Sequence, residues 1–210
     1  MKYLMALLGY ALIGYLLGCI NGSQIIGAIK NIDIGNEGYK NPGASNTTLL
    51  LGWRYGIIVA LIDIGKALLP LIFLRMYLAN EPNLIELLYF TGLFIIIGHN
   101  YPITMKFKGG KGTASIIGMI FAINWKIALI CVGVLLLIGI ISDYFVIGVW
   151  GMYVSLVFST GLSYGFLSFE MTIGLIIMSI STIKHLENYR RIMENKEIRV
   201  SKFIKDKMAL

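Results

Sequence analysis

Glycine and lysine residues are interleaved in one short segment, residues 98–115, which reads GHNYPITMKFKGGKGTAS. Glycine has no Cβ, so the backbone can approach a phosphate closely and point its N–H groups at it, while lysine supplies positive charge. The apolar run that follows would begin a helix, whose N-terminus adds a positive partial charge. The segment predicts a phosphate-binding loop formed by Lys108, Gly109, Gly110, Lys111 and Gly112.

The same segment differs from the P-loop of nucleotide-hydrolysing proteins. A P-loop has four residues between its first glycine and a closing Gly-Lys-Ser/Thr, whereas here position 107 is Phe and Lys111 is followed by Gly112. Nucleotide hydrolysis is therefore not indicated. Taken alone, the string GGKG is equally compatible with an ordinary basic turn.

Two further polar segments interrupt the apolar sequence. Residues 36–46, NEGYKNPGASN, contain small residues and amides but no aliphatic side chain larger than alanine. This stretch suits either an ordinary loop or a polar lining for an anionic substrate, because irregular backbone at membrane depth needs protein or water partners. Residues 183–191, IKHLENYRR, place His185 and Glu187 after the last apolar run. A histidine there is either a base or hydrogen-bond donor, or an interfacial residue with ordinary partners.

Composition places these segments in a membrane protein. Of the 210 residues, 57% are hydrophobic and 14% are charged, and the mean hydropathy is +0.78, which excludes an ordinary soluble domain. Cys19 and Cys131 lie in separate apolar runs, which predicts free, buried thiols and neither a disulfide framework nor a metal site. The LLGC string that ends at Cys19 imitates a lipoprotein signal peptide, but the chain stays apolar to residue 183, which favours an uncleaved first span.

Seven apolar segments are separated by glycine, proline, asparagine or charge. They lie near residues 3–29, 50–75, 84–104, 113–123, 126–141, 144–160 and 162–183. A helix needs about 20 apolar residues to cross a bilayer. We therefore expect an all-α polytopic membrane protein, one integral membrane domain over residues 1–210 with about seven transmembrane helices and a basic tail at 184–210. Because the fourth and fifth segments are short, residues 112–184 are also compatible with two spans and two re-entrant pieces.

The basic residues predict the orientation. Lys and Arg gather at residues 30–54, at 106–111 and from 184 onward, and the net charge is +7. The positive-inside rule places all three clusters in the cytoplasm, although the tail charge also suits attraction to anionic lipid headgroups. Even numbers of spans must then separate the clusters. Seven spans, arranged as one, two and four, satisfy this condition with short cytoplasmic loops that form the site.

The three polar segments resemble, in order and spacing, the motifs of the bacterial acyl-phosphate:glycerol-3-phosphate acyltransferases. Those motifs read GSGNxGATN, GHxxPxxxxFKGGKG and HRENIxRL, and here they appear as GYKNPGASN, GHNYPITMKFKGGKG and HLENYRRI. A fourth match, DIGKALLP at residues 63–70, resembles DxxKGxxP in the family's second span. His99 and Pro102 also match, with a packing role and a chemical role both open. The resemblance covers nearly the whole chain.

This resemblance implies an acyltransferase of phospholipid biosynthesis, with seven spans around a cytoplasm-facing site in the inner (plasma) membrane of a bacterium. Such an enzyme transfers a fatty acyl group from acyl phosphate to the sn-1 hydroxyl of glycerol 3-phosphate, giving lysophosphatidate and phosphate. Its partners would be these two substrates and membrane lipids. We expect no nucleic acid, no soluble cofactor and no metal, and we expect a monomer.

The matching motifs also imply roles for single residues. His185, Lys111 and Asn41 are expected to be catalytic. The residues expected to bind substrate are Lys40, Gly43, Asn46, Lys108, Gly109, Gly110, Gly112 and Glu187.

The chain departs from the family pattern mainly in the first motif. Tyr39 and Lys40 replace a serine and a glycine, Leu49 stands where an arginine is usual, and an early GSIP is altered to GCIN at residues 18–21. Either Lys40 and the Tyr39 hydroxyl replace the lost groups, or both side chains simply face water.

Two functions therefore stay open. One is a working acyltransferase with a modified first loop. The other is a catalytically impaired paralogue that binds lipid phosphates or acyl phosphate, or uses another acceptor. A small transporter is disfavoured, because the charges gather at one membrane face and not within the spans.

Overall fold

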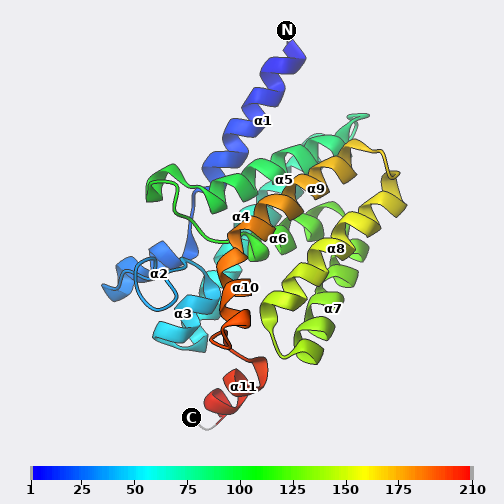
Figure 1. Cartoon of the computed structure of the whole chain (residues 1–210). Helices are drawn as coiled ribbons and strands as arrows, with labels where there is room; N and C mark the ends of the chain where they lie inside the picture. The colour runs from blue at the N-terminus through cyan, green and yellow to red at the C-terminus, as the bar shows by residue number, and fades with distance from the viewer. Residues whose placement is uncertain (1, 209–210) are drawn as a thin grey trace. The chain divides into compact units, whose positions relative to one another are not determined.

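The computed structural model describes residues 2–208, and every regular element within them is helical (Figure 1). The elements are α1 (Lys2–Gly18), α2 (Gly22–Lys30), α3 (Ala44–Leu51), α4 (Trp53–Tyr77), α5 (Leu84–Asn100), the 3-10 turn η1 (Ile103–Met105), α6 (Thr113–Ile123), α7 (Trp125–Ser142), α8 (Phe145–Tyr164), α9 (Phe169–Lys184), α10 (Leu186–Met193) and α11 (Val200–Met208). The expected all-α fold is confirmed.

Five segments of the described chain are long and apolar enough to cross a membrane. They are Leu4–Lys30, Trp53–Tyr77, Leu84–Met105, Trp125–Ser142 and Phe145–Tyr164. A sixth arises if α9 and α10, which meet at an angle of 49°, form one bent span, whereas α6 is shorter. Each of the seven predicted apolar segments thus contains a helix. The number of seven crossings stays a prediction.

The first and the last predicted segments show the largest differences from the observed helices. The first predicted segment, near residues 3–29, is broken into α1 and α2. Asn21 causes the new start, because its side-chain oxygen accepts hydrogen bonds from the backbone N–H groups of Ser23 and Gln24, an N-cap arrangement. Near the other end, α8 continues to Tyr164 and stops at Gly165, whose φ of 106° is open to glycine but not to most other residues. The last predicted segment therefore yields α9 only from residue 169 onward.

The chain divides into two compact units, Met1–Ile123 and Asn124–Leu210. In the first unit, α1 packs along α5. A Cβ on Gly18 would overlap the carbonyl oxygen of Ile95, and one on Gly98 would overlap that of Tyr15. Small residues let helices approach closely where no water drives their association, as in a membrane. Packing of α4 on α6 follows the same rule at Gly118, which lies against the carbonyl oxygen of Ile64.

The polar end of the first unit has a small core of its own. Ile26 of α2, Ile34 of the following loop and Val59 of α4 are buried together, with Leu50 and Tyr55 packed against them. This core holds α2, α3 and the intervening loop on the end of α4. It therefore positions the first polar segment, residues 36–46.

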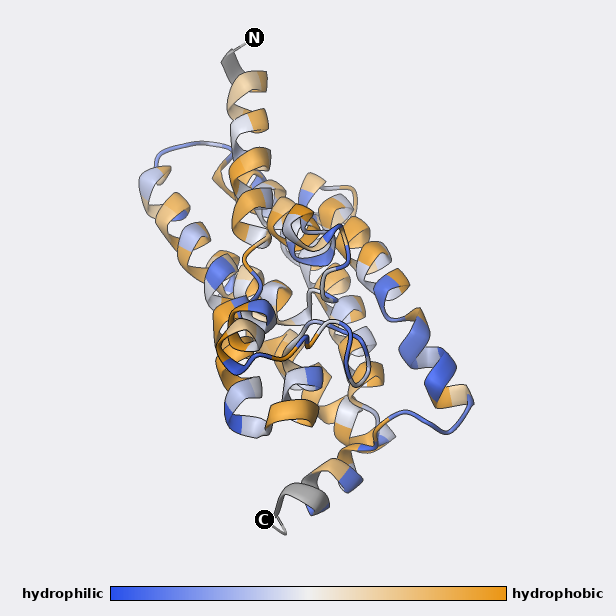
Figure 2. Cartoon of the chain, turned by 90° about the vertical axis from the view of Figure 1, so that its left-hand side faces the viewer, coloured by the Kyte–Doolittle hydropathy of each residue, from blue (hydrophilic) through white to orange (hydrophobic). Residues whose placement is uncertain are grey.

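In the second unit, α7 and α8 run side by side, and α9 packs on α8 (Figure 1). Along the chain, the ribbon changes from mostly hydrophobic in α9 to mostly hydrophilic in α10 (Figure 2). The link between α7 and α8 receives the C-terminal tail, because the side chain of Asp143 accepts hydrogen bonds from Ser201. The two cysteines, Cys19 and Cys131, are buried and free, as expected.

Candidate active site

The first and second polar segments meet in the first unit. The backbone N–H groups of Gly109 and Gly110 donate to the carbonyl oxygens of Asn100 and His99, at 3.2 and 3.1 Å. A Cβ on Gly110 would overlap Nε2 of His99 and lie 2.9 Å from the carbonyl oxygen of Pro42. Only glycine therefore fits between the end of α5 and the NPG part of the first segment.

Asn21 ties this junction to the break between α1 and α2. Its Nδ2 donates to the carbonyl oxygen of Pro42 at 3.3 Å, while its Oδ1 caps α2. Asn21 stands where the related GSIP string has proline. Both residue types suit a helix start, proline through its fixed φ and asparagine through its side-chain acceptor. The change from GSIP to GCIN thus keeps a helix start and adds a hydrogen bond.

Asn46 organises the first segment from within. Its Oδ1 accepts from the backbone N–H of Tyr39 at 2.8 Å, and its Nδ2 donates to the carbonyl oxygens of Ile34 and Glu37 at 2.8 and 2.9 Å. The residue is buried. The side-chain amide of Asn46 is thus hydrogen-bonded to the backbone of the loop. The expected contact of Asn46 with substrate stays a prediction.

Position 40 has a backbone conformation that explains the glycine of the related motif. Lys40 has a φ of 52°, in the left-handed region that glycine enters without cost. Its side chain is exposed, whereas that of Tyr39 is half-buried. Leu49, in place of the usual arginine, is exposed on α3. This chain lacks the serine and the arginine of the related motif. Within residues 36–46, Lys40 is the exposed cation.

The second segment leads directly into a helix. Gly112 has a φ of 85°, and a Cβ there would lie 2.9 Å from Oδ1 of Asn100, so both the conformation and the space favour glycine. Lys111 is half-buried and Lys108 is exposed. Since α6 begins at Thr113, its first N–H groups follow the loop immediately. Lysine charge, buried glycine backbone and a helix N-terminus therefore occur within one short stretch, as a phosphate site requires.

Sequence reasoning did not assign a role to three buried titratable side chains under this loop. Asp63 and Lys66 of α4 form an ion pair, with 3.0 Å between Oδ1 and Nζ, and they are 1% and 7% exposed. Nζ also lies 2.7 Å from Nδ1 of His99, which is 3% exposed. The DxxK spacing could have revealed the pair, because residues three apart share a helix face and charges inside a span must find partners.

The arrangement decides the proton position on His99. An ammonium can only donate, so Nδ1 of His99 accepts from Lys66 at 2.7 Å. Its contact with Asp63 is longer, at 3.6 Å, and is secondary. A neutral imidazole that accepts at Nδ1 carries its hydrogen on Nε2. Nε2–H of His99 consequently faces the backbone at Gly110.

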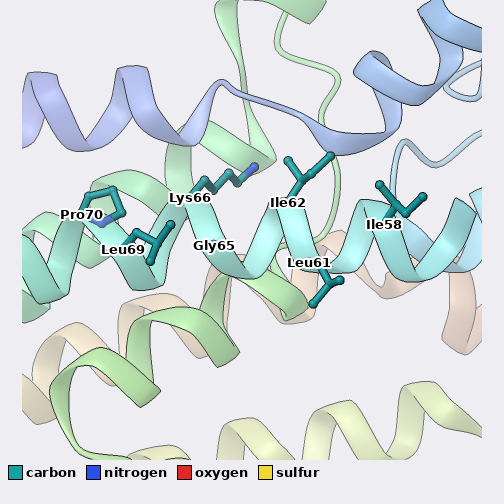
Figure 3. Close-up of a pocket in the computed structure, with 7 residues that line it drawn as sticks. All are labelled: Ile58, Leu61, Ile62, Gly65, Lys66, Leu69 and Pro70. Atoms are coloured by element: carbon teal, nitrogen blue, oxygen red, sulfur yellow. The ribbon is translucent and has the colours of Figure 1, made fainter.

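Lys66 also fastens the end of α1. Nζ donates to the carbonyl oxygens of Gly18 and Ile20, at 3.1 and 2.5 Å. Its aliphatic stem lines a groove of about 510 Å³ along one face of α4, together with Ile58, Leu61, Ile62, Gly65, Leu69 and Pro70 (Figure 3). Figure 3 shows the side chain reaching away from the groove toward the link between α1 and α2. Hydrocarbon and charge are thus separated along one side chain.

The third polar segment lies in the second unit. His185 stands at the bend between α9 and α10, is buried, and has its Nδ1 2.8 Å from the carbonyl oxygen of Ser181. Because a carbonyl only accepts, Nδ1 carries the hydrogen, and Nε2 of the neutral ring is an acceptor. The ring of Tyr153 lies edge-on at 6.1 Å. Glu187 is largely exposed and pairs with Arg191 at 3.5 Å.

Each unit holds part of the predicted set. In the first unit, Gly110 lies against Pro42, whose neighbours Asn41 and Gly43 are half-buried. His185 and Glu187 lie in the second unit. That all three segments serve one site stays a prediction.

Comparison with known proteins identifies the family of this chain. Residues 8–195 match the family model described as glycerol-3-phosphate acyltransferase. The chain belongs to this family. Glycerol-3-phosphate acyltransferase 1 of Oceanobacillus iheyensis is 50% identical over 195 residues, covering 91% of this chain and 93% of the relative. The corresponding protein of Aquifex aeolicus is 33% identical over 194 residues, covering 88% and 94%.

Two crystal structures resemble the fold of this family member. Both are of PlsY (YgiH), described as an integral membrane glycerol 3-phosphate acyltransferase. The glycerol 3-phosphate form has a TM-score of 0.83 at 30% identity and covers 92% of this chain and 95% of that one. The lysophosphatidic acid form has a TM-score of 0.81 at 29% identity with the same coverage. This protein is therefore an integral membrane protein of the acyltransferase family.

Proposed function

We propose that this protein transfers a fatty acyl group from acyl phosphate to the sn-1 hydroxyl of glycerol 3-phosphate, giving lysophosphatidate and phosphate. The observation that carries the proposal is the close fit of Gly110 between His99 and Pro42, which joins the two glycine-rich segments of the family. The related PlsY structures are described as glycerol 3-phosphate and lysophosphatidic acid forms, which name one substrate and the product of this reaction.

Both substrates carry a phosphate, which explains the chemistry of the second segment. Two anions must be held side by side against their repulsion, and positioned cations with backbone N–H groups reduce that cost. Lys108, Gly109, Gly110, Lys111 and Gly112 supply both kinds of group. In the first segment, Asn41 and Gly43 border the same backbone, and Lys40 adds an exposed charge.

The reaction needs no acyl-enzyme intermediate, since acyl phosphate already has a good leaving group. The sn-1 oxygen forms a bond to the acyl carbon, the bond from that carbon to the phosphate oxygen breaks, and the hydroxyl proton passes to a base. The protein would act mainly by orientation and by stabilising the developing oxyanion. Nε2 of His185, an acceptor in the assigned tautomer, suits the hydroxyl. We assign His185 and Glu187 to the reaction by their motif.

The orientation in the membrane is part of the proposal. In the second unit, Asp143 between α7 and α8 hydrogen-bonds Ser201 of the basic tail, so the two lie at one end of that unit. By the positive-inside rule this end faces the cytoplasm. We propose a bacterial inner membrane, a cytoplasmic active face, acyl phosphate as donor and a monomeric enzyme.

The test is product formation by the purified protein in detergent. Palmitoyl phosphate and glycerol 3-phosphate are mixed with the parent, and phosphate release is followed beside lysophosphatidate formation. We expect both products from the parent and neither from Lys111→Ala or His185→Ala. Lys126→Ala is the matched control, because Lys126 is exposed at the start of α7 and belongs to none of the three segments. Phosphate release without lysophosphatidate would contradict the proposed acceptor.

A further inference from the structure

The C-terminal tail turns back onto α10, the helix that carries the third polar segment. α10 ends at Met193, and Asn195 adopts a left-handed φ of 56°. The backbone N–H groups of Lys196 and Glu197 then both donate to the carbonyl oxygen of Arg191, at 2.7 and 3.2 Å. This reversal brings the side chain of Glu197 alongside α10.

The Glu197 carboxylate binds two side chains of that helix. Oε1 accepts from Nδ2 of Asn188 at 2.7 Å, and Oε2 accepts from Nε of Arg191 at 2.7 Å. The side chains of Arg191 and Glu197 are 14% and 13% exposed, so little water competes with this contact. Asn188 and Arg191 are three residues apart and therefore lie on one face of α10. They are the asparagine and the second arginine of the HLENYRRI segment.

These contacts fix the orientation of two polar groups. Because Nδ2 of Asn188 donates to Glu197, Oδ1 of the same amide points away from Glu197. The guanidinium of Arg191 is held at the same time by Glu197 and, through Nη1, by Glu187 at 3.5 Å. Charged hydrogen bonds of this kind are shorter and stronger than neutral ones, so Glu197 restricts both side chains.

A second anchor keeps the tail in place. Asp143 accepts through Oδ1 from the backbone N–H of Ser201 at 2.7 Å and through Oδ2 from its hydroxyl at 2.8 Å. The backbone N–H of Val200 donates to the carbonyl oxygen of Asp143 at 2.9 Å. The start of α11 is therefore tied to the link between α7 and α8. Glu197 lies between this anchor and the turn at Asn195.

We propose that Glu197 is a positioning residue for the acyl transfer. It holds the Asn188 amide and the Arg191 guanidinium in the orientation in which the third segment works, and the anchored tail keeps it there. The family match ends at residue 195, so Glu197 lies beyond the matched range. The inference rests on the proposed function, because a positioning residue needs a reaction to serve.

The test compares Glu197→Gln with Glu194→Gln. Glu194 lies in the same tail, and its side chain pairs with Arg190 and Lys196, each at 2.9 Å. Glutamine keeps the shape of the carboxylate, yet its NH2 group cannot accept from either donor. We expect Glu197→Gln to lower kcat for lysophosphatidate formation by about 10- to 100-fold, because a small misplacement of reacting groups costs this much. Glu194→Gln should stay within about twofold of the parent, as expected for exposed ion pairs.

Two readouts separate positioning from a merely structural role. In an Asn188→Ala background, Glu197→Gln should cause a smaller loss than it causes in the parent, because one of the two groups through which it acts is missing. Hydrogen exchange of residues 186–193 should rise in Glu197→Gln and stay unchanged in Glu194→Gln.

A full additional loss in the Asn188→Ala background, unchanged exchange or a parental kcat for Glu197→Gln would overturn the inference. A parent that makes no lysophosphatidate would refute the proposed function and the inference together, whereas an active parent with an unaffected Glu197→Gln refutes the inference alone.

Discussion

Nζ of Lys66 lies 2.7 Å from Nδ1 of His99, and this contact joins α4 to the end of α5, against which the glycine-rich loop lies. Lys66 is held by Asp63 and by two carbonyl oxygens at the end of α1, while His99 lies against Gly110. Residues from α1, α4 and α5 thus converge below one loop. A buried ammonium and a buried imidazole in a span are costly unless each has partners, and here each provides one for the other. The cluster supports the loop mechanically and fixes the hydrogen of His99 on Nε2.

The buried ion pair predicts a large stability loss when one partner is removed. Lys66→Met leaves the Asp63 carboxylate buried without its cation, and we expect the free energy of unfolding to fall by about 3–5 kcal/mol. Thermal unfolding in detergent measures this change. The double variant Asp63→Leu/Lys66→Met removes both charges and should lose less than Lys66→Met alone. If the double variant loses the sum of the two single losses, the pair is not the source of the effect.

Gly110 predicts a steric effect on activity. Gly110→Ala would push a methyl group into Nε2 of His99, so the loop must move. We expect lysophosphatidate formation to fall by about 100-fold, since displacement of a substrate-positioning group by about 1 Å costs this much. The matched control is Gly133→Ala on α7, where a Cβ would meet nothing within 4 Å. Parental activity of Gly110→Ala would show that the loop accommodates the methyl group and does not depend on its contact with His99.

The helices were predictable from the sequence, whereas the contacts of the site were less so. Long apolar runs specify spans because unpaired backbone groups are costly in lipid, and each predicted run does contain a helix. The break at residues 19–21 was missed, because Asn21 was considered as a departure from a motif and not as an N-cap. Periodicity alone cannot show that a polar side chain in an apolar run begins a new helix.

The cluster of Asp63, Lys66 and His99 was missed for a different reason. Lys66 and His99 are 33 positions apart, and the carbonyl of Gly18 is 48 positions from Lys66, so no local pattern relates them. The DIGKALLP string did mark the first two residues, but their chemistry depends on which helices pack together. Close packing at Gly18 and Gly98 brings α1 and α5 together, and this follows from small residues on facing surfaces.

Substitutions of Lys40 should have separate effects on glycerol 3-phosphate binding and on the stability of the fold. If its ammonium replaces the missing arginine, both Lys40→Ala and Lys40→Gly should raise the KM for glycerol 3-phosphate several-fold. Their stabilities should differ, because a left-handed φ costs about 1–2 kcal/mol for residues other than glycine. Lys40→Gly should therefore unfold at a higher temperature than Lys40→Ala. An unchanged KM in both variants would show that Lys40 simply faces water, and Lys126→Ala controls for the loss of one surface charge.

We expect acid to release the C-terminal tail by breaking the contact between Asp143 and Ser201. Hydrogen bonds from the backbone N–H and the hydroxyl of Ser201 lower the pKa of its carboxyl below the ordinary value of 3.8, and nearby Arg199 adds to the effect. A carboxylate whose pKa is lowered on folding stabilises the folded state above its unfolded pKa, and the contribution is lost as pH falls through the folded pKa. The tail should thus stay docked at neutral pH and detach only below about pH 3.8.

A spin label on the variant Lys205→Cys measures this release. Position 205 is exposed on α11, whereas the native Cys19 and Cys131 are buried, so labelling is selective. The label should gain mobility in acid, and Asp143→Ala should make it mobile at neutral pH. Ser201→Ala keeps the backbone donor but loses the hydroxyl, so the transition should move toward pH 3.8 without disappearing. A label that is equally mobile in the parent and in Asp143→Ala at neutral pH would mean that Asp143 does not anchor the tail, and Glu197 would then depend on the turn at Asn195 alone.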